Sequence, residues 1–358
     1  MDADNFFVRG NRAHLALAPG ECVSVTCSIC IANYNGIGLI DECLASVRAQ
    51  NFGDPIEIIV HDDASNDGSA EHIRANYPDV LLIESKKNVG FCVANNRMAD
   101  AAQGQYLLLL NNDAALLPGA LTTLKSEAVR LGRPAILSLP QYDAETEDLL
   151  DIGSLLDPFL NPIPNLNPRL NDVGMVMGAC LWIPKILWDE LGGFPEWFES
   201  LAEDMFLCIY AFILGHDIAV LNKSGYFHKV GHSFGGGKIK QNKLVTTYKR
   251  RRLSERNKCY VMILFYPAFL LNVILPVHLF LLFIEGLLLA MIKRDLKIFV
   301  YIYLNAFKDL WRRKSFLYKK RSLYQSKRRI SYRKLLSVFI YFPCKLKMLL
   351  IHGLPSVR

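Results

Sequence analysis

Lysine and arginine are absent from residues 259–292, CYVMILFYPAFLLNVILPVHLFLLFIEGLLLAMI, and this stretch holds a single acid, Glu285. Such a composition excludes an ordinary solvated surface, and 34 residues are enough for one membrane-spanning helix. Acids are scarce throughout residues 241–358, which carry 4 Asp/Glu against 25 Lys/Arg, or +21. Residues 1–240 carry 30 against 16, or −14. The two parts are therefore expected to face different environments.

The 9 cysteines lack the spacing of a disulfide or zinc framework and fall mostly inside apolar runs. That habit is typical of small buried side chains in a reducing compartment. Cys27-x-x-Cys30 has no second pair, so a metal or redox role is its minor interpretation. The first residues also lack the basic start and apolar core of a signal peptide. We therefore expect the acidic part to be cytoplasmic.

What is present in the acidic part is a regular alternation of β-rich and helical patterns. Short apolar runs are each followed by a polar turn and an amphipathic segment, about every 20–30 residues. This predicts an α/β fold with a mostly parallel sheet and helices on both faces. The predicted strands are 23–31, 55–62, 80–85, 105–110 and 176–184, and the predicted helices include 38–50, 69–75 and 91–103. Residues 141–172, rich in Pro, Asn and Asp, predict a long loop or small subdomain covering the site.

Polar clusters follow three of these strands, at Asn33–Gly36, Asp62–Gly68 and Asn111–Asp113. Parallel sheets bind ligands at the carboxyl ends of their strands, so the three clusters predict one pocket. Helix capping explains Asp67, but the adjacent Asp62 and Asp63 repel each other unless a donor or cation lies between them.

A hard cation, Mg²⁺ or Mn²⁺, would suit Asp113, because such ions take few carboxylates and complete their shell with phosphate oxygens. Glu203 and Asp204 begin an apolar helix pattern. Asp204 either caps that helix or takes a proton from an attacking hydroxyl. His228 is either a buried hydrogen-bonding imidazole or a metal or phosphate contact.

In this order, the segments resemble the family-2 glycosyltransferases, inverting enzymes with the GT-A fold. The resemblance covers about residues 24–235 and is carried by CSICIANYNG, VHDDASNDGS, NVGFCVANN, LLLLNND, GACLWIPKILWDELGGFPEWFESLAEDMFLC and HKVGHS. Asp63 replaces the family's usual Asn. Phe206 replaces the second acid of its E-D-x-D, which affects acceptor contacts rather than the base.

The resemblance implies roles for individual side chains. Asp62 would contact the nucleotide base, Asp113 would bind the metal with His228, and Asp204 would be the catalytic base, with Glu203 beside it. The nucleotide pocket would be formed by Asn33, Tyr34, Asn35, Asp62, Asp63, Asn88 and Asn112.

The basic part predicts contact with an anionic membrane. Pro267, Asn272 and Pro276 interrupt 259–292, and both flanks are basic, which favours a re-entrant or in-plane helical pair over a single span. A buried pair in a soluble oligomer is the third alternative. Residues 298–318 mix aromatics with cations and predict an interfacial helix rather than a nucleic-acid site.

We therefore divide the chain into an extension (1–22), a GT-A domain (23–240), a basic linker (241–258), apolar helices (259–292) and a basic tail (293–358). The predicted function is metal-dependent, inverting transfer of a sugar from a nucleotide-diphosphate donor to a lipid-linked, undecaprenyl-diphosphate glycan. It would take place at the cytoplasmic face of the inner (plasma) membrane.

The resemblance favours the rhamnosyltransferase-like branch, hence dTDP-rhamnose as donor. The alternatives are a UDP-sugar enzyme, a processive polysaccharide synthase and a non-catalytic membrane scaffold. A processive synthase is expected to carry Q-x-x-R-W, whereas Gln241 is followed by Asn-Lys-Leu-Val. Intact Asp62, Asp113 and Asp204 disfavour the scaffold. The sequence leaves the oligomeric state open.

Overall fold

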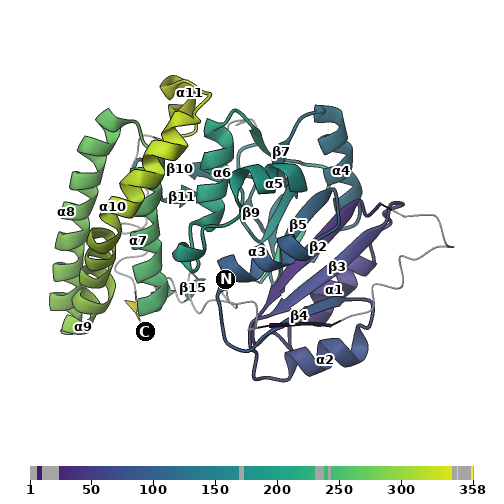
Figure 1. The fold of residues 1–358 in the computed structure, drawn as a ribbon. Coiled ribbons are helices and arrows are strands. Elements are labelled where there is room, and N and C mark those ends of the chain that lie inside the picture. The colour runs from purple at the N-terminus through teal and green to yellow at the C-terminus, as the bar shows by residue number, and fades with distance from the viewer. Residues whose placement is uncertain are drawn as a thin grey trace.

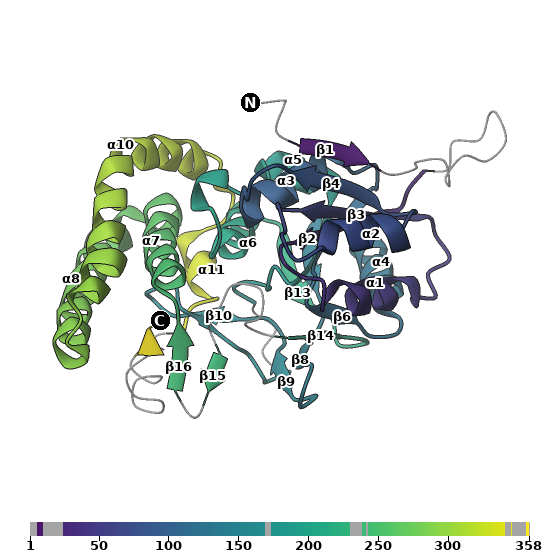
Figure 2. The ribbon, with the colours of Figure 1, turned by 90° about the horizontal axis from the view of Figure 1, so that it is seen from below.

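The computed structural model describes residues 6–9, 24–168, 173–229, 238–240, 243–340, 345 and 356–357. A sheet with helices around it forms one side of the molecule, and a group of long helices stands beside it (Figure 1). Figure 2, turned by 90°, shows the same two parts side by side. They correspond to the acidic and basic parts of the sequence.

The main sheet has eight strands in the described part of the chain, in the order β1-β4-β3-β2-β5-β12-β7-β13. Strands β4, β3, β2 and β5 run parallel, and β12 runs antiparallel between β5 and β7. The strands are β1 (Phe6–Arg9), β2 (Cys27–Asn33), β3 (Ile56–Asp62), β4 (Leu81–Ser85), β5 (Tyr106–Asn111), β7 (Ala135–Ser138), β12 (Cys180–Pro184) and β13 (Asp217–Val220). The predicted α/β fold is confirmed, and β1 adds an edge strand from within the predicted extension 1–22.

The central strands are apolar throughout because helices cover both faces of the sheet. Alternate residues enter different cores: Cys30 and Ile59 belong to one, Ile29 and Val60 to the other. On the first face lie α3 (Phe91–Ala101), α5 (Lys185–Leu191) and α6 (Glu203–Ile213); on the second lie α1 (Ile40–Arg48), α2 (Ser69–Asn76) and α4 (Ala120–Leu131).

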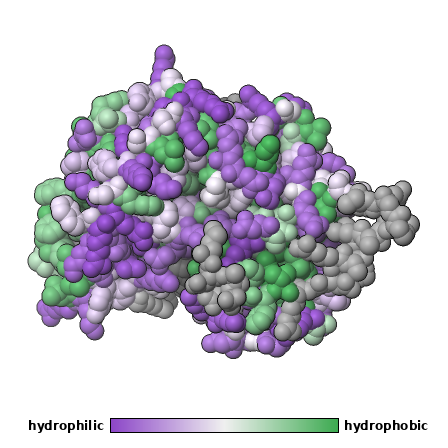
Figure 3. Space-filling view, viewed as in Figure 1, coloured by the Kyte–Doolittle hydropathy of each residue, from purple (hydrophilic) through white to green (hydrophobic). Residues whose placement is uncertain are grey.

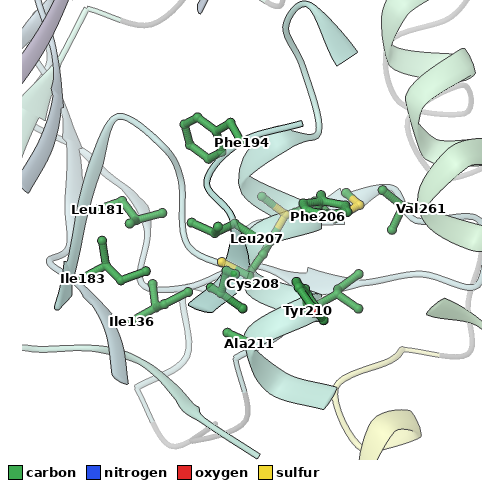
Figure 4. Close-up of a cluster of buried hydrophobic side chains, with 14 of the residues drawn as sticks. Ile136, Leu181, Ile183, Phe194, Phe206, Leu207, Cys208, Tyr210, Ala211 and Val261 are labelled. Carbon is green, nitrogen blue, oxygen red and sulfur yellow. The ribbon is translucent and has the colours of Figure 1, made fainter. Parts of the chain in front are cut away.

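Helix α6 is apolar nearly all round because it lies between the sheet and the helical part. Figure 4 shows its side chains Phe206, Leu207 and Tyr210 between Leu181 of β12 and Val261 of the helical part. The first two residues of α6 are Glu203 and Asp204.

Residues 141–168 contain short strands, which favours the small subdomain over the long loop; residues 169–172 of the expected segment lie outside the described residues. Strands β6 (Ala114–Leu116), β14 (Tyr226–His228), β8 (Gln141–Asp143) and β9 (Leu149–Asp151) form a second sheet, and β10 (Leu155–Leu156) pairs with β11 (Pro162–Ile163). The chain also forms a small sheet from β15 (Lys238–Lys240), β16 (Lys243–Thr246) and β17 (Ser356–Val357). The second sheet brings β14, and with it His228, beside β6 directly after Asp113.

The basic part forms long helices whose borders differ from those of the sequence pattern. Helix α7 (Tyr248–Phe265) unites most of the predicted linker with the start of the apolar stretch, and its second half is buried against α6. The remaining elements are α8 (Ala268–Lys293), α9 (Leu296–Ile298), η3 (a π-helix, Phe299–Leu304), α10 (Asn305–Ser326), α11 (Tyr332–Leu336) and the 3₁₀ turn η2 (Glu196–Phe198) near α6. The helical backbone is interrupted at Pro267, so residues 259–292 are divided between the end of α7 and α8.

Helix α8 is the one described helix that is long and apolar enough to cross a membrane; its mean hydropathy is 2.4 and 28% of the most apolar window is buried. Leu282 and Leu289 pack against the π-helix, whereas Phe280 and Met291 are more than 60% exposed. The acid of this helix is paired: Arg251 and Lys345 bind Glu285, and Tyr303 donates to it at 2.9 Å.

Candidate functional site

The carboxyl ends of β2, β3 and β5 meet through side-chain hydrogen bonds. Asn33 and Asp62 are opposite each other in the parallel register, and Asn33 Nδ2 donates to Asp62 Oδ2 at 2.9 Å. Asn112 Nδ2 donates to Asn33 Oδ1 at 2.8 Å. All three side chains are buried, so each polar atom needs a partner. The three clusters expected at one sheet edge do lie together.

Gly36 is required by this network. A Cβ at Gly36 would lie 2.2 Å from Asn112 Nδ2 and 2.3 Å from Asn33 Oδ1. Asn35, at φ +49°, holds the next turn, because its Oδ1 accepts a hydrogen bond from the Asn66 amide at 2.9 Å.

Asp62 and Asp63 avoid mutual repulsion because each carboxylate has its own donors. Ser65 donates to Asp62 through its amide at 2.9 Å and its hydroxyl at 2.7 Å. Asp63 accepts from the amides of Val89 and Gly90 at 2.7 and 2.8 Å. Burial raises the pKa of Asp63, and these amides oppose that rise. Of the two expected ways to hold these adjacent acids, a donor or a cation, the structure shows donors.

Asp113 lies beside His228, as the second sheet requires. His228 Nε2 is 3.1 Å from Asp113 Oδ1, and His228 Nδ1 is 3.1 Å from Gln141 Nε2. Tyr226 donates its hydroxyl to Gln141 Oε1 at 3.0 Å, which orients the Gln141 amide nitrogen toward the imidazole. Nδ1 then accepts and Nε2 carries the proton toward Asp113. In this arrangement His228 orients Asp113. Its Nε2 could bind a metal only if the proton moved to Nδ1, which requires the Gln141 amide to turn its oxygen toward the imidazole.

The chain provides part of a metal site here. Among the described residues, no three His, Cys, Asp or Glu side chains gather to hold an ion. One buried carboxylate, with an imidazole beside it, fits Mg²⁺ or Mn²⁺ only when phosphate oxygens and water complete the shell. The donor set therefore fits a cation that arrives with a diphosphate.

Glu203 and Asp204 form the opposite wall, at the start of α6. Asp204 accepts from the amides of Gly178 at 3.1 Å and Met205 at 2.7 Å. Glu203 is 93% buried, and its Oε2 has no hydrogen-bond partner among the described residues. Burial and the neighbouring Asp204 charge raise the pKa of Glu203 to about 8, and burial also raises the pKa of Asp204. Burial and the Asp204 charge therefore favour the protonated form of Glu203 at neutral pH.

The two walls enclose a cavity of about 360 Å³, in the range of small-molecule sites. Two of the predicted residues, Asp62 and Asn35, are not part of its lining, whereas Tyr34 lines it and is 47% exposed. The lining includes nine of the predicted residues, namely Asn33, Tyr34, Asp63, Asn88, Asn112, Asp113, Glu203, Asp204 and His228.

Sequence reasoning missed Arg250, Gln141, Ser200 and Leu201, which also line the cavity. Arg250 stands in the run YKRRR, where it is one of several flanking cations. Its place in α7, two residues after the first helical residue, is what brings it to the cavity. Burial lowers its pKa, and the Glu203 carboxylate opposes this. No local signal separates Arg250 from its neighbours.

Residues 28–160 match the family model Glycosyl transferase family 2. This segment contains the β2–β3–β5 edge together with Asp113. Residues 28–160 form a glycosyl transferase family 2 domain. The fold and the match agree, since the matched residues are those that build the polar edge.

The curated relatives are similar over parts of their length. An uncharacterized protein of Mycobacterium tuberculosis, MT1568, is 30% identical over 116 residues, which cover 30% of this chain and 36% of that protein. A second relative in that organism, named N-acetylglucosaminyl-diphospho-decaprenol L-rhamnosyltransferase, is 25% identical over 42% of this chain and 59% of its own length. A Campylobacter jejuni relative, named GalNAc(5)-diNAcBac-PP-undecaprenol beta-1,3-glucosyltransferase, is 30% identical over 28% and 34%. The matches cover less than two thirds of each of these relatives.

Two solved structures share the fold. S. aureus TarS 1-349, in complex with UDP-GlcNAc, has a TM-score of 0.55 at 18% identity and is matched over 88% of this chain and 89% of its own. GalNAc-T7 with UDP, GalNAc and Mn²⁺ has a TM-score of 0.55 at 16% identity, over 68% and 49%. The GT-A fold expected from the sequence is confirmed.

Proposed function

We propose that this family-2 transferase moves a sugar, with inversion, from a nucleotide-diphosphate donor to a lipid-linked glycan. The observation that carries the proposal is the cavity itself. One wall is the polar edge of β2, β3 and β5; the other is the carboxylate pair of α6. A nucleotide sugar requires this separation, because the acceptor approaches the sugar from the side opposite the leaving diphosphate.

The donor nucleotide would lie along the polar edge. Asp62 would contact the base, with Asn33, Tyr34 and Asn35 around it. Supporting this assignment, the Asn112–Asn33–Asp62 chain of hydrogen bonds fixes these side chains before any ligand arrives. Asp63 and Asn88 would form the adjoining wall, since the amides after Asn88 hold the Asp63 carboxylate.

The diphosphate would lie at Asp113. Asp113 would hold Mg²⁺ or Mn²⁺ with the phosphate oxygens, and His228 is the second candidate ligand. A bound cation would stabilise the charge that develops on the leaving diphosphate. Arg250, the one Lys or Arg among the described residues that line the cavity, adds a positive charge for an anionic substrate.

Asp204 would act as the catalytic base. The acceptor hydroxyl oxygen bonds to the anomeric carbon as the bond from that carbon to the diphosphate oxygen breaks, and the hydroxyl proton passes to Asp204. Direct displacement inverts the anomeric centre. Two backbone amides aim the Asp204 carboxylate, and Glu203 stays protonated beside it.

The acceptor class is proposed from the named relatives and from the helical part. Both relatives with assigned names act on polyprenol-diphosphate-linked sugars by those names. Figure 3 shows apolar residues at the edge of the molecule that α8 occupies in Figure 1. This face would rest on the anionic cytoplasmic leaflet of the plasma membrane, with α10 as an interfacial helix, and place the cavity near a lipid-linked glycan. Rhamnose from dTDP-rhamnose is our proposed donor.

Calorimetry on the full chain in detergent tests the donor site. dTDP-rhamnose, UDP-GlcNAc and GDP-mannose would each be titrated with Mn²⁺ and with EDTA. We expect Mn²⁺-dependent binding of the dTDP sugar, and loss of that dependence in Asp113→Asn. Binding of another nucleotide would reassign the donor, and binding of none by the folded protein would refute the transferase function.

A further inference from the structure

The segment between η2 and α6 has an uncommon backbone. Glu199, Leu201 and Ala202 have φ values of +67°, +73° and +63°, a region that side chains other than glycine rarely occupy. Ser200 and Leu201 line the cavity, and the next two residues are Glu203 and Asp204. Such a backbone persists only where neighbouring groups hold it.

Helix α7 supplies those groups. Asn257 Nδ2 lies 3.0, 2.9 and 2.7 Å from the carbonyl oxygens of Phe198, Ser200 and Leu201. Arg256 donates through Nη2 to the Phe198 carbonyl and through Nη1 to the Glu199 carboxylate, both at 2.8 Å. Both residues are buried, so the donors on Asn257 and Arg256 depend on these acceptors, and removing either side chain leaves its partners without the bond.

The opposite side of the segment touches the start of α3. The Cys92 amide donates to the Glu199 carbonyl at 3.3 Å, and a Cβ at Gly90 would lie 3.2 Å from that same oxygen. The segment is therefore fixed between α3 and α7. The carbonyls of Phe198, Ser200 and Leu201 turn toward α7, that of Glu199 turns toward α3, and α6 then begins with Glu203 and Asp204 at the cavity.

We propose that Asn257 and Arg256 are positioning residues for the transfer reaction: they hold residues 198–202 in the conformation that presents Asp204 to the acceptor hydroxyl. The proposal rests on the function assigned above to Asp204. We call Asn257 and Arg256 together the clamp. Arg256 Nη1 also lies 3.6 Å from Asp309 Oδ2, so the clamp contacts α10 as well. A movement of α10 would therefore be transmitted through Arg256 to the segment that precedes Glu203 and Asp204.

The test compares Asn257→Ala with Ser254→Ala, a half-buried position on the same helix. In Asn257→Ala we expect kcat to fall at least tenfold while the donor Kd changes less than twofold. The donor affinity is retained because the polar edge is built by β2, β3 and β5 and not by α7. Ser254→Ala should match the wild type in both. An unchanged kcat in Asn257→Ala, or an equal loss of donor affinity, would overturn the proposal.

A second variant separates positioning from stability. Glycine adopts positive φ without steric strain, so adding Ala202→Gly to Asn257→Ala should recover part of the lost thermal stability. The kcat should stay low, because a segment without its clamp does not hold Asp204. Recovery of kcat together with stability would reduce the clamp to a purely structural role. Arg256→Lys, which keeps the charge but cannot make both bonds, should give a smaller loss of the same kind.

Hydrogen exchange provides a readout that does not depend on turnover. Amides of residues 199–205 should exchange faster in Asn257→Ala and at the wild-type rate in Ser254→Ala. Unchanged exchange in Asn257→Ala would refute the clamp, whatever the activity. Faster exchange in a protein that binds no nucleotide sugar would refute the transferase function and leave the clamp standing.

Discussion

Asp204 is the side chain on which the proposed chemistry depends. Asp204→Asn keeps the size of the side chain but removes the proton acceptor, so we expect kcat to fall roughly 10²–10⁴-fold. Donor affinity should stay within a factor of about two, since the nucleotide edge lies on other strands. Turnover assays and donor titration of the purified variant measure both.

Asp189→Asn is the matched control, because Asp189 is an exposed acid on α5 that pairs with Lys185. It should behave as the wild type. Retained activity in Asp204→Asn would show that another group takes the proton.

Glu203 makes stability depend on pH. Its pKa is raised from an ordinary 4.5 to about 8, because burial and Asp204 disfavour the charged form. The folded state then holds a proton that the unfolded state releases, so stability is fully present below about pH 4.5 and falls as pH rises toward 8. In Glu203→Gln this loss should be absent. Urea unfolding between pH 5 and 8.5 would show the wild type losing stability relative to the variant, whereas parallel profiles would contradict the assignment.

At the residue scale the sequence identified the polar edge but not its hydrogen bonds. From the sequence, Asp62 and Asp63 were expected to need a donor or a cation between them, because a sequence gives adjacency and not the direction of the side chains. In the folded chain Ser65 serves one carboxylate and the amides after Asn88 serve the other. The roles assigned to these residues stay predictions.

The two sides of α8 should respond differently to truncation. Leu282 is buried against the π-helix and Phe280 is 64% exposed. Leu282→Ala should lower the free energy of unfolding by about 2–5 kcal/mol. Phe280→Ala should change it by less than about 1 kcal/mol but weaken binding to lipid vesicles.

Chemical denaturation in detergent and vesicle flotation measure the two effects. If Phe280→Ala destabilises the protein as strongly as Leu282→Ala, its side chain is a core residue and the membrane face is wrong.

Element borders were predictable where the pattern was local. Strands β2 to β5 and helices α1 to α3 lie within a few residues of their expected places, since alternation and turn signals are read directly from the chain. Helix α7 was not recognised, because its first turns are cationic and its last turns apolar. Only the packing of its second half against α6 makes it one helix.

At the scale of the whole molecule, residues 1–240 carry a net charge of −14 and residues 241–358 one of +21. This division predicts that membrane binding depends on lipid charge and on salt. Vesicles with anionic lipid should bind more tightly than neutral ones, and raising salt from 0.1 to 1 M should weaken the difference, because the screening length falls from about 10 to 3 Å. Co-sedimentation at both salt concentrations provides the measurement.

Neutralising Lys319 and Lys320 of α10 should reduce binding to anionic vesicles only. Equal binding to neutral and anionic vesicles at low salt would show that α8 alone carries the attachment.

The sequence by itself determined the α/β class, the polar strand ends and the division into an acidic and a basic part. Hydrophobic periodicity and charge are properties of residues close together in the sequence, so they can be read without knowledge of the fold. Tertiary structure decided which distant groups meet: Asp113 with His228 across the second sheet, and Arg250, Arg256 and Asn257 with the wall that carries Asp204. The first contact depends on the pairing of β14 with β6, and the others depend on how α7 packs against α6; both bring together residues far apart in the sequence.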